Sequence, residues 1–216
     1  MFKRRKPRSY SQLATEMIYP RGGWRRASQY VMHRIRRLPD QPQRIARGFA
    51  AGTFVSFTPF FGFHFMMAAL VAWVIRGNIV AALLGTFVGN PLTFPFIAVL
   101  SVTLGRRMLD VEGTLQPHRI FEEFARASAE LWNNLLAPFT DATMHWQNFD
   151  YFWSNYFLPY LVGGVGPGLA ASVVGYYLTV PVIRAYHKRR SRKMAERIAR
   201  VQDAPQPATP PEDDKG

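Results

Sequence analysis

The apolar stretch Gly77–Leu104 limits, more than any other feature, what this chain can fold into. It contains 28 residues without a charge, and about 20 apolar residues are enough for a helix to cross the hydrocarbon core of a bilayer. Asn90 and Pro91 lie near its middle, and a proline inside a helix removes a hydrogen bond and clashes with the preceding turn. The stretch therefore predicts two half-helices, the second beginning with Asn90 as N-cap and Pro91 as first helical residue.

Two further apolar segments flank this stretch and are interrupted in the same way. Residues 48–75 contain Thr58-Pro59, and residues 157–183 contain the glycine-rich run that ends in Gly166-Pro167-Gly168. Broken helices are tolerated at membrane depth only where protein or a water-filled cavity shields the free backbone groups. We therefore predict an all-α integral membrane protein with three Pro/Gly-broken hydrophobic segments of re-entrant character, accompanied by amphipathic surface helices.

Charge is segregated along the chain and suggests three regions. Residues 1–47 carry thirteen Lys/Arg and two acids, and residues 184–200 carry eight Lys/Arg and one acid. We predict a basic, largely disordered segment at 1–23 and a membrane domain at 24–185 with an amphipathic insert at 106–150. A basic helix and disordered tail follow at 186–216. Basic residues next to membrane segments favour the cytoplasmic side, so both termini of this multi-pass inner-membrane protein should be cytoplasmic.

Two cytoplasmic termini conflict with three apolar segments, because they require an even number of crossings. Either one segment is therefore expected to re-enter on the side from which it came, or all three segments enter and return, and the sequence does not decide which segment is re-entrant. The side on which the 106–150 insert lies is also open.

Two helices outside the apolar segments are predicted to be amphipathic. The helix at 24–38 has a basic face suited to an anionic membrane surface, although basic flanks also bind nucleic acid. The membrane is favoured because this helix leads directly into an apolar segment. In the insert, Ile120, Phe124, Ala127, Leu131 and Leu135 follow helical spacing, which predicts a helix on the bilayer or on the bundle.

A short internal repeat joins the first two apolar segments. Gly52-Thr53-Phe54-Val55 recurs 33 residues later as Gly85-Thr86-Phe87-Val88, and a capped proline follows each copy. Two adjacent spanning copies would run in opposite directions, as in inverted-repeat transporters. The alternative is that these four residue types recur through ordinary membrane composition.

The order of several short motifs resembles one known family. These are Ile45-Ala46 followed by Gly48, Ala50, Gly52 and Phe54; Pro59, Gly62 and His64; Arg76-Gly77-Asn78; Gly85-Thr86; Asn90-Pro91-Leu92-Thr93 with Pro95; and Gly105. The pattern is similar to the bacterial membrane family catalogued as domain of unknown function 2062, over roughly residues 30–185. The resemblance implies an uncharacterised bacterial inner-membrane protein and brings no activity, cofactor or catalytic residue.

The breaks provide the candidate site. Each half-helix N-terminus carries a partial positive charge and free N–H groups, so we expect the three breaks to meet in one polar pocket. The predicted pocket residues are Thr58, Pro59, Gly62, His64, Asn90, Pro91 and Thr93. The alternatives are a neutral, hydrogen-bonded His64 and an Asn90 that only caps its helix. Arg76 is a candidate headgroup contact, because arginine near a helix end extends to the interface.

No catalytic grouping, metal-ligand spacing or phosphate-binding glycine loop occurs in the sequence. We therefore expect no enzymatic activity and no cofactor. Two functions stay open: a small transport or lipid-handling module built on half-helix N-termini, and a structural or partner-recruiting membrane scaffold with basic cytoplasmic tails. The expected partners are membrane lipids with anionic headgroups, and a second copy or another membrane protein is a further possibility. No specific nucleic acid is expected.

Overall fold

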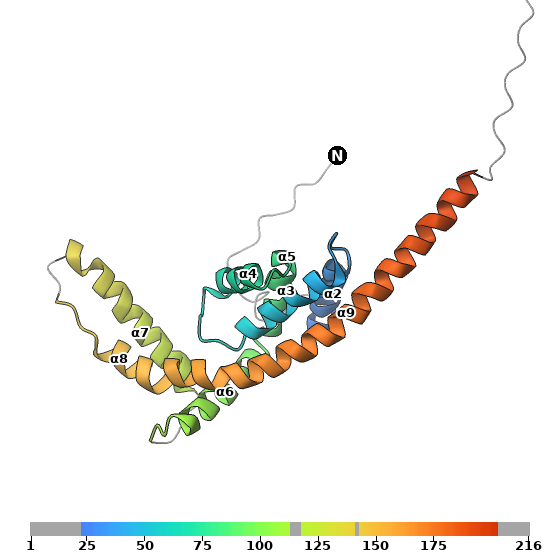
Figure 1. Cartoon of the computed structure of the whole chain (residues 1–216). Coiled ribbons are helices and arrows are strands. Elements are labelled where there is room, and N and C mark those ends of the chain that lie inside the picture. Colours follow the sequence, from blue (N-terminus) through green and yellow to red (C-terminus); the bar gives the residue numbers. More distant parts are fainter. Residues whose placement is uncertain (1–22, 113–117, 141–142, 203–216) are drawn as a thin grey trace, which may run out of the picture.

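The computed structural model describes residues 23–112, 118–140 and 143–202, and all regular elements within these ranges are helices (Figure 1). The expected all-α fold is confirmed. The disorder predicted near the two ends of the chain falls largely on residues 1–22 and 203–216, which lie outside the described residues. The elements are α2 (Gly23–Arg36), α3 (Pro42–Val55), α4 (His64–Val74), α5 (Ile79–Gly85), η1 (Thr86–Val88), α6 (Phe94–Met108), α7 (Arg119–Leu136), η2 (Ala137–Phe139), α8 (Gln147–Phe152), the π-helical η3 (Trp153–Phe157) and α9 (Leu158–Gln202).

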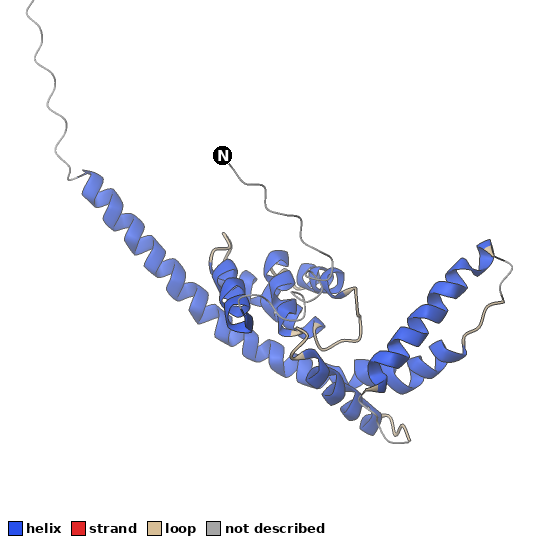
Figure 2. Cartoon of the chain, turned by 180° about the vertical axis from the view of Figure 1, so that it is seen from behind, coloured by secondary structure: helices blue, strands red, loops and turns tan. Residues whose placement is uncertain are grey.

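Helix α9 is the longest element, and both α3 and α6 pack against it (Figures 1 and 2). The end of α3 meets the first half of α9, where a Cβ atom on Gly164 would overlap the Phe57 carbonyl oxygen. Earlier in α3, the Ala50 carbonyl accepts a hydrogen bond from Ser172 Oγ at 3.0 Å. The residue numbers of the contacts decrease along α3 while they increase along α9, so the two helices are antiparallel.

The break predicted at Gly166-Pro167 is wrong, because α9 continues through this region as one helix. The neighbouring glycines serve helix packing instead of a break. A Cβ atom on Gly163 would overlap the Ser101 carbonyl oxygen of α6, so these two helix backbones are in direct contact. Packing along α3 and α6 offsets the cost of a proline inside a helix, which is about 3 kcal/mol.

The first apolar segment folds into a turn-separated pair of helices. Helix α3 ends at Val55 and α4 begins only at His64, so the break predicted at Thr58-Pro59 is confirmed. Its predicted capping is wrong. Pro59 precedes the helix by several residues, and the Thr58 hydroxyl donates back to the Val55 carbonyl oxygen at 2.6 Å.

Helix α4 returns alongside α3. Near the start of α3, the Arg47 guanidinium donates a hydrogen bond at 3.0 Å to the carbonyl oxygen of Arg76, which follows α4. Ala51 of α3 shares a buried cluster with Ala68 and Ala72 of α4. Small side chains let the two helices approach closely, so residues 48–75 form a compact antiparallel hairpin.

Helix α5 runs parallel to α3 and contacts it through glycines. A Cβ atom on Gly48 would overlap the Asn78 carbonyl oxygen, and one on Gly52 would overlap the Ala82 carbonyl oxygen. The four-residue spacing places both glycines on the same face of α3. Because the contacts advance in the same direction along both helices, α3 and α5 are parallel.

The two Gly-Thr-Phe-Val copies meet at this contact. A Cβ atom on Gly85 would lie 3.1 Å from the Cα atom of Gly52. The predicted inverted orientation is wrong, because α4 brings the chain back before the second copy begins. Both copies therefore point the same way.

The insert forms a second hairpin, in which α7 packs against α8 (Figure 1). Its contact combines an apolar cluster, in which the rings of Phe124 and Phe152 are 5.8 Å apart, with buried polar side chains. The buried Glu130 carboxylate accepts hydrogen bonds from the backbone N–H groups of Asn148 and Phe149, so it caps the first turn of α8. Asn134 is also buried, and both its amide oxygen and its amide nitrogen bond to the backbone of His145.

This capping turns part of the predicted apolar stripe of α7 outward. Ile120 and Ala127 are buried as expected, whereas Leu131 and Leu135 are 47% and 61% exposed. Amphipathic spacing predicted the helix and the first half of its packing face, at Ile120 and Ala127, but not the second half, where Glu130 and Asn134 are buried through their partners near the start of α8.

One continuous helix in the described ranges, Gln147–Glu196, is long and apolar enough to cross a membrane. The helices His64–Val74 and Ile79–Val88 are apolar but shorter. The sequence suggested three such segments. Fewer helices are long enough to cross a membrane because turns divide the first two apolar segments into shorter helices.

Two glycines of α9 provide a direct test of this packing. Replacing Gly163 with Ala should destabilise the protein by about 1–3 kcal/mol, as expected for an overpacked contact. Replacing Gly166 with Ala should cost clearly less, since no part of a neighbouring helix lies within 4 Å of a Cβ atom there and only the ring of the following Pro167 opposes a side chain at this position. Thermal unfolding of the detergent-purified variants measures both changes. Equal effects of the two substitutions would contradict the α6–α9 backbone contact.

Candidate functional site

Two of the three predicted breaks lie next to each other. Ser56 Oγ donates a hydrogen bond at 3.2 Å to the Thr86 carbonyl oxygen, which joins the turn after α3 to η1. The aromatic rings of Phe61 and Phe94 are 5.0 Å apart and meet edge to face. The turns that precede α4 and α6 therefore pack on one another, in part through aromatic rings. That the breaks share one polar pocket stays a prediction.

Polar side chains in the first of these turns bond to nearby backbone. Thr58 and Pro59 are buried, and the Thr58 carbonyl oxygen lies 3.3 Å from His64 Nε2. Gly62 has φ 81°, in the left-handed region that glycine adopts at least cost. This geometry fits the alternative in which His64 is hydrogen-bonded within the bundle.

The second turn is organised by Asn90. Its side-chain oxygen accepts hydrogen bonds from the N–H groups of Leu92 and Thr93 at 2.9 and 3.2 Å. Its carbonyl oxygen accepts from Phe94 N–H at 2.8 Å. These bonds cap the turn of residues 91–93, whereas α6 itself begins at Phe94 with Thr93 as its N-cap. The predicted helix start, with Asn90 as N-cap and Pro91 as first helical residue, is therefore wrong by three residues. Asn90 and Thr93 also line a cavity of about 510 Å³ beneath α2.

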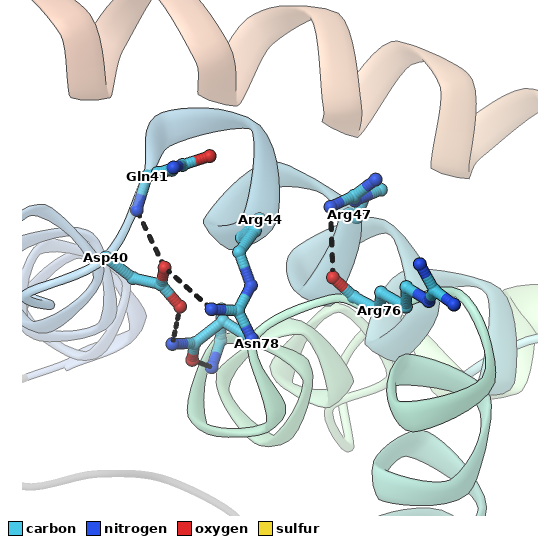
Figure 3. A network of polar contacts seen from close by, with 7 residues as sticks. Asp40, Gln41, Arg44, Arg47, Arg76 and Asn78 are labelled. Carbon is cyan, nitrogen blue, oxygen red and sulfur yellow. Dashed lines mark hydrogen bonds and ion pairs between the residues drawn. The ribbon is translucent and has the colours of Figure 1, made fainter.

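A separate polar network joins the start of α3 to the turn between α4 and α5 (Figure 3). One Asp40 carboxylate oxygen accepts from Asn78 Nδ2 at 2.9 Å, and the other accepts from Gln41 N–H at 2.8 Å. Arg44 lies 3.4 Å from the same carboxylate. Asn78 in turn accepts from Ala81 N–H at 2.8 Å and caps α5.

The geometry of the turn between α4 and α5 accounts for the three residues Arg76, Gly77 and Asn78. Arg76 has φ 53°, which closes the end of α4. A Cβ atom on Gly77 would lie 2.7 Å from the Gly48 nitrogen, so the turn fits only if this residue is glycine. Asn78 N–H donates at 2.8 Å to the Arg44 carbonyl oxygen of α3. The turn is thereby fixed against the start of α3.

Three arginines converge on a hollow of about 600 Å³ at this turn. Arg44, Arg47 and Arg76 all line it, and Asp40 is the only acid among the lining residues. Among the described residues, the Arg76 guanidinium has no partner, and the buried Arg47 Nε atom has none either. The exposed Trp73 lies on the rim. An arrangement with excess guanidinium groups binds anions, with planar donors that match carboxylate or phosphate oxygens.

Asp40 is charged at neutral pH and compensates one of these cations. Burial raises the pKa of its carboxyl group, but the Asn78 hydrogen bond, the Gln41 N–H group and the charges of Arg44 and Arg47 outweigh that effect. The pKa therefore lies below its ordinary value. Three arginines and one carboxylate line the hollow, which leaves it with a net positive charge.

Sequence reasoning found Arg76 but missed its neighbours. Arg44 and Arg47 are three residues apart, on one face of a helix that begins at Pro42. They were counted only as part of the basic N-terminal flank. A sequence signal was available, because a lone acid precedes the proline that starts this basic helix. In the described ranges no three His, Asp or Glu side chains are grouped to bind a metal ion.

Comparison with known proteins agrees with the motif resemblance. A family model described as "Uncharacterized protein conserved in bacteria (DUF2062)" matches residues 25–192. No curated protein and no solved structure matches the chain.

The cap of α5 gives a prediction for this network. Replacing Asn78 with Ala removes the N-cap and the bond to Asp40, so it should cost about 1 kcal/mol or more of unfolding free energy. Replacing the exposed Thr103 of α6 with Ala should change stability little. The midpoints of thermal unfolding in detergent compare the two variants. An unchanged midpoint for Asn78→Ala would show that the network does not fix the turn.

Proposed function

Because this chain belongs to the DUF2062 family of uncharacterised bacterial proteins, we propose its function from its own geometry: it is a multi-pass inner-membrane protein that binds anionic lipid headgroups. The binding site is the hollow formed by Arg44, Arg47 and Arg76. In this proposal the protein needs no cofactor and catalyses no reaction.

Exposed apolar side chains support the membrane location. Helix α4 exposes Phe65, Met66, Leu70 and Trp73. On α9, large apolar residues are exposed along the charge-free part of the helix, including Leu169, Val173, Tyr177 and Leu178. Soluble monomers seldom expose contiguous apolar faces of this kind, whereas lipid chains would cover them.

The α3–α4 hairpin supports an even number of crossings. In our proposal, α3 enters the membrane and α4 returns to the same side, so residues 48–75 are the re-entrant segment. The chain then crosses once through α5 and α6, and α9 crosses back. Both basic flanks consequently face one side, which the excess of Lys and Arg assigns to the cytoplasm.

The depth of the arginine hollow is the observation that carries the lipid proposal. Ile45 of α3 and Ala81 of α5 share a buried cluster with Ile183 of α9. Ile183 is the last residue of the charge-free stretch, directly before Arg184. The start of α3 and the α4–α5 turn are therefore level with the point where α9 becomes charged. Arginine and tryptophan at this level fit the headgroup region.

A transport function has less support. The hydroxyl and amide groups near the two adjoining breaks bond to the backbone of their own turns, as with Thr58 and Asn90. The second candidate, a scaffold that recruits a partner, is favoured by the end of α9. Beyond Arg184 this helix continues to Gln202, away from the bundle (Figure 2), and its Lys and Arg side chains between Lys188 and Lys193 are exposed.

Lipid-dependent stabilisation tests the headgroup site. A ligand that binds only the folded state adds about 2.7 kcal/mol at one hundred times its dissociation constant. We expect phosphatidylglycerol to raise the unfolding midpoint of the detergent-purified protein more than phosphatidylcholine does. The triple variant Arg44→Gln, Arg47→Gln, Arg76→Gln should lose most of this difference.

The control removes a cation elsewhere. Arg107→Gln alters an exposed arginine at the end of α6, outside the hollow, and should keep the lipid response. An equal response of the wild type and the triple variant to phosphatidylglycerol would refute the headgroup site.

A further inference from the structure

The cavity beneath α2 is separate from the arginine hollow. It measures about 510 Å³ and lies between α2 and the segment that runs from α5 to the start of α6. Small-molecule sites typically measure roughly 300–1,000 Å³ and are mostly apolar. Trp24, Val31, Phe49, Leu84 and Phe87 contribute to its wall. The cavity therefore has the size and lining of a site for an apolar group.

The way α2 packs explains why this space exists. Val31 and Ile35, in the second half of α2, are its buried residues and join the cluster around Ile183. The apolar stripe predicted to face the membrane thus packs partly against the bundle. The first half of α2 has no buried residue, and the cavity opens along it at Trp24, Arg25 and Ser28.

Nearly all the polar side chains that line the cavity form hydrogen bonds within the protein. Ser28 Oγ donates to the Arg25 carbonyl oxygen at 2.9 Å, and Asn90 and Thr93 bond within their own turn. Arg25 is the only charged residue in the lining, and its exposed guanidinium has no partner among the described residues. The cavity combines an apolar wall with one unpaired cation at the surface.

We propose that this cavity binds a single-chain anionic amphiphile, a long-chain carboxylate, with its chain inside and its head on Arg25. An apolar chain gains about 25 cal/mol for each Å² of surface that it removes from water. A guanidinium matches a carboxylate with two parallel hydrogen bonds. Nucleotides and sugars fit poorly because few free donors and acceptors line the wall. This site does not depend on the headgroup site at Arg76.

Photolabelling of the full-length protein in maltoside detergent tests the site. The probe is a long-chain fatty acid with a diazirine at its methyl end, and mass spectrometry locates the label. We expect label on peptides that contain α2 and residues 84–93. Ser28→Trp should fill the cavity and abolish that label. Gln29→Trp, an exposed position outside the lining, should keep it.

A second, independent labelling experiment tests the role of the Arg25 charge. Arg25→Gln should weaken labelling by the carboxylate roughly two- to fivefold, the size of a partly exposed ion pair. It should leave labelling by the methyl ester of the same probe unchanged. If circular dichroism shows that Ser28→Trp does not fold, this comparison decides the outcome. Label spread evenly over the exposed faces of α4 and α9, or equal losses for acid and ester, would overturn the proposal.

Discussion

Direct contact between helix backbones at glycine is the interaction on which the rest of this structure depends. Gly105 of α6 lies against the Pro159 carbonyl oxygen, and Gly163 of α9 lies against that of Ser101. A methyl group at either glycine would overlap the neighbouring helix. If the helices lie in lipid, as we propose, there is little hydrophobic driving force between them, and close packing of small residues would supply the association energy. Helices α3 and α5 are in backbone contact in the same way, at Gly48 and Gly52.

The contact between α3 and α5 also places the charged groups. Because Gly48 and Gly77 touch, the turn after α4 lies directly on the start of α3. Arg47 can then donate to the Arg76 carbonyl oxygen, and Asn78 can bond to Asp40. The arginine hollow is thus a consequence of helix packing and not a feature of one loop. Its position level with Ile183 follows from the shared cluster that joins the starts of α3 and α5 to the middle of α9.

Local chemistry predicted part of this arrangement. Proline and asparagine located the two real breaks, because these effects act within one turn of chain. They did not give the residues at which the following helices begin, which are His64 for α4 and Phe94 for α6. The break at Gly166-Pro167 was wrong, since glycine packing against α3 and α6 outweighed the proline. The direction of the repeat was also wrong, because it depends on whether α4 returns. Arg47 was missed because its partner Arg76 is 29 residues away in sequence. Arg44 pairs with Asp40 only four residues before it, so that contact was within reach of sequence reasoning.

The central claim is that the α3–α4 hairpin returns to the cytoplasmic side, which places the Arg76 turn with both basic flanks. Single cysteines test it directly, since the native chain has none. Cysteine at the exposed positions Val80 and Ser191 should react with an impermeant maleimide only after spheroplasts are permeabilised. Cysteine at Asp110, beyond α6, should react in intact spheroplasts. Labelling of Val80→Cys from outside would contradict the account.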